Sequence, residues 1–265
     1  MSIKMIVSDL DGTLFNSDEE NYEISKELIK EVKEFQKKGK IFTIATGRPI
    51  ETSLEVVKTL GINAPYIAYN GAKIVDCNGK EIYSEDFSLT IWLPFLEEFK
   101  KAGASVIFYH NGQVFCLNYN ERISVYEKKE ITKCIEADED FLKDELQISK
   151  ILIIGDVEKF KVIFENLHQS LKDEFRYVIS EDDYFEIIKN NVSKGNALKR
   201  LKEHLSIEDD EVVTIGNHMN DKELIEEGYV GAAVFNAVDG LKNIADVVTH
   251  GEYEKGVIQL IRKYK

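Results

Sequence analysis

The sequence predicts an α/β fold in which a doubly wound parallel sheet is interrupted by a smaller α+β module. Short apolar runs typical of buried strands alternate with segments of helical periodicity at both ends of the chain. Polar, glycine-containing stretches follow several of these runs, as at the carboxyl ends of parallel strands. The alternation stops between residues 84 and 188, so we expect a core of residues 1–83 and 189–265 and an inserted domain of residues 84–188.

The first expected strand is the apolar run that begins at Met5 and ends in Asp9, Asp11 and Gly12. Residues i and i+2 of an extended chain point to one side, so both carboxylates should converge where the strand ends. Two carboxylates this close are unfavourable unless a cation lies between them or one holds a proton, and both arrangements are useful in catalysis. The alternative is an Asp-Gly turn in which the acids only form the turn.

The chain then continues with alternating helices and strands. We expect a helix over residues 22–38, a strand over 41–45, a helix over 50–60, a strand over 66–69 and a β-hairpin over 73–83. The two strands end in Thr46-Gly47-Arg48 and Asn70-Gly71. Because the carboxyl ends of parallel strands meet at one edge of a sheet, these residues should face the same crevice as Asp9.

The inserted region has a different order of elements, typical of a mixed α+β module. We expect a helix over residues 89–102, a hairpin of strands 105–109 and 114–117, a strand over 151–154, a helix over 157–171, and strands over 177–179 and 185–188. The acidic stretch 136–145 is interpreted as a solvated loop or helix face.

The core resumes near residue 190. Ser193 is a plausible N-cap for a helix that starts with Lys194-Gly195 and continues to residue 204. A buried strand over 212–215 follows and ends in the polar stretch Gly216-Asn217-His218-Met219-Asn220-Asp221. Strands over 230–235 and 245–249, each preceded by a helix, and a helix from residue 253 complete the pattern.

The composition is that of an ordinary globular protein and argues against two classes of partner. A net charge of −14 over 265 residues disfavours binding to nucleic acid or to an anionic membrane, since both need clustered Lys and Arg. The three cysteines are widely spaced and are interpreted as reduced thiols. The first strand begins about three residues in, and no apolar run approaches the ~20 residues of a membrane span, so we expect a cytoplasmic protein.

Four motifs in order resemble those of the haloacid dehalogenase superfamily. They are Asp9-Leu-Asp-Gly-Thr13, Thr46-Gly-Arg48, Ser193-Lys194-Gly195 and Gly216-x-x-x-Asn220-Asp221. With Asn70-Gly71-Ala72 and an insertion of this size, the chain resembles the Cof-like branch, whose members carry a type IIB cap. The resemblance covers essentially the whole chain and implies a Rossmann-like core with the insertion as its cap.

The resemblance implies a phosphatase that works through an aspartyl-phosphate. Asp9 resembles the nucleophile of the family, Asp11 its general acid and base, and Lys194 a fixed positive charge beside Asp9 and the phosphate. Thr46 should offer its hydroxyl to a phosphate oxygen, with help from backbone amides of the loop at Gly47.

Three further side chains are implied to touch phosphate or substrate: Arg48, Asn70 and Asn220. For two of them a purely structural role is the alternative. Arg48 would equally serve to hold a carboxylate, and Asn70 would equally serve as a turn former. His218 lies inside the last motif and is given no role.

The implied cofactor is Mg²⁺, because carboxylate, carbonyl and water oxygens suit a hard cation. Its expected ligands are Asp9, Asp11, Asn217 and Asp221. The sequence departs from the family pattern at Asn217, where the family usually has an Asp that binds the metal directly. An amide oxygen still coordinates Mg²⁺ but brings no charge, so we expect an active enzyme with weakened metal affinity.

These features predict a Mg²⁺-dependent phosphatase of small phosphate esters, such as sugar phosphates, acting as a monomer or small homo-oligomer. The cap would exclude water as a lid and select the substrate, with Tyr184 and Phe185 as candidate contacts unless they pack in the core. One alternative is a phosphomutase or phosphotransferase on the same fold. Another is a catalytically weakened binding protein for a phosphorylated ligand, which only Asn217 favours.

Overall fold

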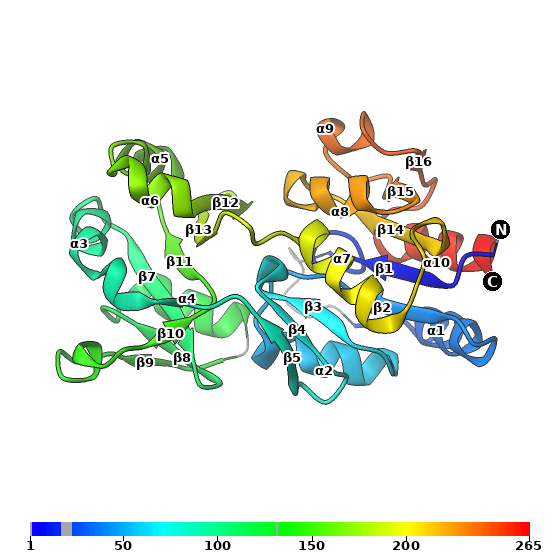
Figure 1. The fold of residues 1–265 in the computed structure, drawn as a ribbon, viewed down its shortest axis with the longest axis horizontal. Helices are drawn as coiled ribbons and strands as arrows, with labels where there is room; N and C mark the ends of the chain where they lie inside the picture. Colours follow the sequence, from blue (N-terminus) through cyan, green and yellow to red (C-terminus); the bar gives the residue numbers. More distant parts are fainter. Residues whose placement is uncertain (1, 17–22, 131) are drawn as a thin grey trace. The chain divides into compact units, whose positions relative to one another are not determined.

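The computed structural model describes residues 2–16, 23–130 and 132–265. The chain forms two compact units (Figure 1). Unit 1 consists of Met1–Tyr83 and Ser193–Lys265, and unit 2 consists of Ser84–Val192. Among the helices of these described ranges, none is both long and apolar enough to cross a membrane.

Unit 1 is built on a parallel sheet with strand order β16-β15-β14-β1-β2. Its strands are β1 (Met5–Ser8), β2 (Ile41–Ile44), β14 (Val212–Gly216), β15 (Val230–Ala233) and β16 (Val247–Val248). Strand β1 lies at the centre, with Met5 opposite Val212 on one side and opposite Ile41 on the other. All of these pairs are parallel, so the residues that follow β1, β2 and β14 meet at one edge.

Helices enclose this sheet. They are α1 (Lys26–Lys37), α2 (Ile50–Leu60), α7 (Lys194–Leu205), α8 (Lys222–Glu227), α9 (Asp239–Lys242) and α10 (Tyr253–Tyr264). Met5 and Val7 of β1 pack with Leu198 of α7 and Leu224 of α8. The first predicted helix begins at Lys26, where Ser25 Oγ accepts a hydrogen bond from the Leu28 backbone amide; its predicted start at residue 22 lies outside the described residues.

The third expected strand of the parallel sheet pairs differently. Strand β3 (Tyr66–Ala68) forms an antiparallel pair with β4 (Lys73–Val75), which continues to β5 (Glu81–Ser84). Within the described residues it joins the main sheet at an isolated parallel bridge between Ala45 and Ile67, next to which the Thr46 amide donates to the Ile67 carbonyl at 3.0 Å. The reason is local, because β3 is three residues long and turns at once into the short 3-10 helix η1 (Tyr69–Gly71).

Unit 2 has a six-stranded sheet of order β12-β13-β11-β7-β8-β9, antiparallel except for the pair β8 and β9. The strands are β7 (Ser105–His110), β8 (Gln113–Cys116), β9 (Cys134–Glu136), β11 (Ile151–Ile154), β12 (Phe175–Glu181) and β13 (Tyr184–Lys189). Helices α3 (Leu93–Lys101) and α5 (Val157–Glu165) pack their apolar residues on one face of it. Phe185 belongs to this core, and Tyr184 is also buried.

One prediction for unit 2 is wrong in detail, and one helix of this unit was not predicted. The single helix expected over 157–171 is two helices, α5 and α6 (Gln169–Glu174), because Asn166 ends α5 and the His168 side chain caps α6 by accepting from the Ser170 amide. Helix α4 (Glu121–Lys129) was not predicted, since only Ile123, Tyr126 and Glu127 of its residues are buried and its periodicity is weak.

Trp92 is part of the unit 2 core and gives a stability prediction. It is fully buried, stacks on Phe164 and meets the edge of Phe175. We expect Trp92→Ala to lower the free energy of unfolding of unit 2 by about 3–5 kcal/mol, because it leaves a large cavity, and Trp92→Phe to lower it by less. Urea denaturation followed by circular dichroism measures both; equal losses for the two variants would contradict the cavity argument.

Candidate active site

The edge of the parallel sheet brings together residues from three strand ends. Asp9 follows β1, Thr46 follows β2, and Asn217 follows β14. Strand β1 is continued into this edge by the Asp9 amide, which donates to the Ile215 carbonyl at 2.9 Å. The site therefore forms at the carboxyl ends of β1 and of its two neighbours, β2 and β14.

Asp9 is buried and held by two side chains. The ammonium of Lys194 donates to Asp9 Oδ1 at 2.6 Å, and the Thr13 hydroxyl lies 3.0 Å from Oδ2. Burial raises the pKa of Asp9 to about 7, and the nearby Asp221 charge acts in the same direction, whereas Lys194 opposes both. The orientation of the carboxylate is thus fixed, and Lys194 neutralises its charge only in part.

Lys194 lies between two carboxylates at the first position of α7. Its ammonium also donates to Asp221 Oδ1 at 2.6 Å, and the side chain is 1% exposed. Burial alone lowers the pKa of Lys194, but the charges of Asp221 and Asp9 raise it above its usual value. Ser193 caps the helix by accepting from the Asn196 amide, so the position of the ammonium is set by the start of α7.

Asp221 is fully buried and uses both oxygens within the protein. Oδ1 accepts from Lys194, and Oδ2 accepts from the backbone amides of Asn217 and His218 at 3.0 and 3.3 Å. Gly216 makes this close approach possible, because a Cβ there would lie 2.5 Å from Asp221 Oδ2. Asp221 therefore fixes the loop after β14 and orients Lys194.

Asp11 is held by Arg48 in a forked ion pair. The guanidinium Nε lies 2.9 Å from Asp11 Oδ2, and another of its nitrogens lies 2.7 Å from Oδ1. The Arg48 guanidinium also lies over the Phe15 ring at 5.1 Å. The Asp11 side chain keeps about a third of its surface exposed, so it is both oriented and accessible to solvent. Of the two roles that the sequence left open for Arg48, this contact matches the holding of a carboxylate.

The loop after β2 is stabilised by backbone hydrogen bonds around Thr46. Its hydroxyl oxygen accepts from the Arg48 amide at 3.0 Å, which leaves the hydroxyl proton available for another acceptor. The Asn70 amide donates to the Thr46 carbonyl at 3.0 Å, with Asn70 in the left-handed conformation at φ 55°. A Cβ on Gly47 would lie 2.9 Å from Asn70 Oδ1, so the two turns touch.

The Asn217 side chain ends among oxygens. One terminal amide atom lies 3.1 Å from Asp9 Oδ2, 2.9 Å from the Asp11 carbonyl oxygen and 2.9 Å from Thr13 Oγ1. With the Asn217 oxygen turned inward, this spacing also suits neighbouring Mg²⁺ ligands, since metal–oxygen bonds of ~2.1 Å at right angles place ligands ~3.0 Å apart. Asp9, the Asp11 carbonyl and Asn217 therefore fit a small hard cation.

Within residues 2–16, 23–130 and 132–265, no three His, Cys, Asp or Glu side chains are arranged to hold a metal ion. The candidate ligands at Asp11 and Asn217 are a backbone carbonyl and an amide, which are not among these side chains. Asn220 lies in the 3-10 helix η5 (Met219–Asp221), is partly exposed, and is close in sequence to the cluster.

Comparison with known proteins identifies the family. The sequence model of the haloacid dehalogenase-like hydrolases matches residues 6–261. The chain belongs to the haloacid dehalogenase-like hydrolases. This confirms the resemblance seen in the motifs, including the Cof-like branch, and the chain is a phosphoric monoester hydrolase of this family.

Individual relatives align with nearly the whole hydrolase. Phosphatase YwpJ of Bacillus subtilis is 28% identical over 294 residues, which cover 98% of this chain and 99% of that protein. The 5-amino-6-(5-phospho-D-ribitylamino)uracil phosphatase YcsE of the same organism is 26% identical, covering 100% and 96%. A crystal structure of a haloacid dehalogenase-like hydrolase from Bacteroides thetaiotaomicron superposes with a TM-score of 0.86 at 26% identity, with both chains fully covered. The α/β class with a parallel sheet is thereby confirmed.

Sequence reasoning missed two contacts of this hydrolase's site. Thr13 stands inside the first motif, yet only the structure shows its hydroxyl between Asp9 and Asn217. Asn236 donates to the Gly12 carbonyl at 2.8 Å and accepts from the Tyr253 amide, which ties the β1 turn to the start of α10. Thr13 was detectable from its place next to Gly12, whereas nothing near Asn236 in the sequence signals its role.

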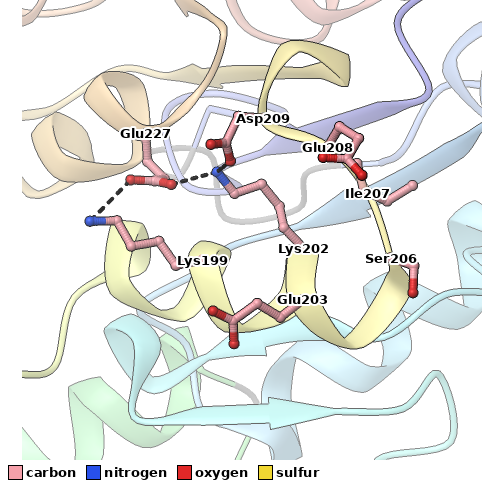
Figure 2. Close-up of a pocket in the computed structure, with 8 residues that line it drawn as sticks. All are labelled: Lys199, Lys202, Glu203, Ser206, Ile207, Glu208, Asp209 and Glu227. Atoms are coloured by element: carbon pink, nitrogen blue, oxygen red, sulfur yellow. Dashed lines mark hydrogen bonds and ion pairs between the residues drawn. The ribbon is translucent and has the colours of Figure 1, made fainter.

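A separate hollow lies at the other end of α7, where Lys202 pairs with Asp209 and Glu227 (Figure 2). Its eight lining residues are Lys199, Lys202, Glu203, Ser206, Ile207, Glu208, Asp209 and Glu227. Each charged group drawn in contact has an oppositely charged neighbour. We interpret the hollow as a surface ion-pair network, and Lys202 serves below as a control for Lys194.

Proposed function

We propose that this hydrolase is a Mg²⁺-dependent phosphatase of small phosphate esters, such as sugar phosphates, that works through an aspartyl-phosphate on Asp9. The observation that carries the proposal is the buried Asp9 carboxylate, held by Lys194 and Thr13 beside the Arg48–Asp11 pair. A carboxylate that is fixed in direction and only partly neutralised is suited to attack phosphorus.

The proposed reaction has two steps. Asp11 would enter the reaction protonated from solvent, which releases one arm of its Arg48 pair. A carboxylate oxygen of Asp9 attacks phosphorus, the ester bond breaks, and Asp11 gives this proton to the leaving alkoxide. Asp11 then takes a proton from water, the resulting hydroxide attacks phosphorus, and the bond to Asp9 breaks to release phosphate. Arg48 orients Asp11 for both transfers, while Lys194 and the Thr46 hydroxyl stabilise charge on the phosphoryl oxygens. Asn70 and Asn220 are proposed to contact the phosphate or substrate.

The metal would be held by Asp9, Asp11 through its carbonyl, and Asn217, with Asp221 acting on it at most through water. When bound, Mg²⁺ neutralises charge that develops on the transferred group. An amide ligand supplies no charge, so we expect the Mg²⁺ concentration for half-maximal activity to be roughly 10-fold higher in the wild type than in Asn217→Asp. Equal requirements in a Mg²⁺ titration of the two proteins would contradict this prediction.

Unit 2 is proposed to act as a lid that excludes water and selects the leaving group. Phe185 packs in its core, so it is not a candidate for substrate contact, and Tyr184 is largely buried. Exchanging residues 84–192 for the cap of a relative should change the substrate preference. If the substrate preference is unchanged after the exchange, unit 2 does not select the substrate.

The test is phosphate release from a panel of sugar, nucleotide and other small phosphate esters, with Asp9→Asn as the inactive control. The panel includes 5-amino-6-(5-phospho-D-ribitylamino)uracil, the compound named for one relative. Mg²⁺-dependent phosphate release is the expected result; an isomerised ester without free phosphate would instead indicate a phosphomutase. We propose a small phosphorylated metabolite as the partner and the cytoplasm as the location, consistent with three free cysteines.

A further inference from the structure

The Asn217 amide can present either its nitrogen or its oxygen to Asp9, and the two choices have different consequences. We propose that Asn217 takes the place of the cation in the metal-free enzyme. Its NH₂ group then donates to Asp9, the Asp11 carbonyl and Thr13, and the amide rotates by half a turn when Mg²⁺ binds. The inference rests on the metal requirement of the proposed function and concerns the state that precedes metal binding.

Counting protons shows why the two states differ. The Asp9 carboxylate and the Asp11 carbonyl only accept, and the Thr13 hydroxyl has one proton. With the nitrogen inward, Thr13 donates to Asp9 at 3.0 Å and the two amide protons serve the three oxygens at 2.9 to 3.1 Å. With the oxygen inward, four oxygens share the single Thr13 proton. That arrangement leaves oxygens facing one another without donors, and a bound cation would stabilise it.

The packing around Asn217 favours rotation in place over withdrawal of the side chain. The other terminal atom of its amide faces the Gly12 backbone so closely that a Cβ on Gly12 would lie 2.2 Å from it. Gly12 also has φ 76°, a conformation that favours glycine. A half-turn about the last side-chain bond exchanges two atoms of similar size and needs no further space.

An aspartate at this position has no such second state. Without metal, Asn217→Asp would bring a second carboxylate against Asp9 and the Asp11 carbonyl and would remove the amide donor. The wild-type amide therefore stabilises the metal-free enzyme, and the same hydrogen bonds must break before metal binds. Weak metal affinity is then a consequence of a stable metal-free site as well as of the missing charge.

Thermal melting in EDTA and in saturating MgCl₂ tests the proposal without an activity readout. The matched control is Asn63→Asp, which makes the same charge change at an exposed position of unit 1. In EDTA we expect Asn217→Asp to melt about 4–8 °C below the wild type, as for the loss of two buried hydrogen bonds, and the control within about 1 °C. MgCl₂ should raise the melting temperature of Asn217→Asp more than that of the wild type and so close the gap.

The outcomes separate this inference from the proposed function. If Asn217→Asp has the same melting temperature as the wild type in EDTA while MgCl₂ stabilises both proteins, the inference is overturned and the metal requirement stands. If MgCl₂ stabilises neither protein, the inference about Asn217 and the proposed metal requirement are both wrong. An independent measurement follows the ¹H–¹⁵N side-chain signals of Asn217, identified by their absence in the variant. They should shift on adding MgCl₂ to the wild type, and unchanged signals at saturation would also overturn the rotation.

Discussion

Asp9→Asn is expected to lower kcat for every phosphate ester that the wild type hydrolyses by about 10⁴-fold or more. The amide is a far poorer nucleophile than the carboxylate, and it cannot form the proposed aspartyl-phosphate. The fold should survive, because an amide has the same shape and relieves repulsion with Asp221. Single-turnover and steady-state phosphate release measure the loss, and melting temperature verifies the fold.

Asp9→Glu is the informative companion variant. It keeps the charge beside Lys194 but moves the carboxylate by one methylene, which displaces it from the position set by Lys194 and Thr13. If Asp9 acts as the nucleophile, this variant should also lose at least about 10²-fold, because attack requires close alignment. Substantial turnover in Asp9→Asn would instead mean that another group attacks phosphorus.

Lys194→Met should have the second largest effect, on stability and activity together. It leaves Asp9 and Asp221 buried without their shared cation, and breaking a buried ion pair in this way costs about 3–5 kcal/mol. We expect kcat to fall by about 10²-fold or more, since a fixed charge beside the phosphate is lost. Urea denaturation at pH 7 and steady-state kinetics give the two quantities.

Lys202→Met is a matched control on the same helix. Lys202 is also buried and also pairs with two carboxylates, but Asp209 is 92% exposed and remains hydrated when the lysine is removed. We expect a loss of about 1 kcal/mol or less and unchanged kcat. The double variant Lys194→Met with Asp221→Asn should regain part of the lost stability but no activity. Similar losses at Lys194 and Lys202 would show that burial of a lysine on α7, and not the Asp9 contact, determines the effect.

Much of the site could be predicted because its residues occupy strand ends. The chemistry-bearing residues after β1, β2 and β14 are marked in the sequence by apolar runs that stop at polar, glycine-containing stretches. Parallel pairing then brings them to one edge. Lys194 is not at a strand end; it reaches Asp9, 185 positions away, from the start of α7 at 2.6 Å. The apolar pattern and the parallel topology are therefore sufficient to predict which residues after these strands meet at the site.

The partner of each side chain could not be predicted in the same way. Whether Arg48 binds phosphate or holds a carboxylate depends on a few ångströms between it and Asp11, and no sequence period encodes that distance. The assignment of Asp221 to the metal likewise did not anticipate that two backbone amides and Lys194 occupy its oxygens. In unit 2, α4 was missed because tertiary packing, and not its own weak amphipathic pattern, stabilises it.

The central place of β1 in its sheet has a consequence for synthesis on the ribosome. β1 pairs on one side with β2, which follows it closely, but on the other side with β14, which emerges about 200 residues later. Until then one edge of an apolar strand has no partner, and such edges recruit other chains. Unit 2 is a continuous segment that is complete before β14 appears, so we expect it to fold first, with chaperones most needed while the nascent chain waits for β14.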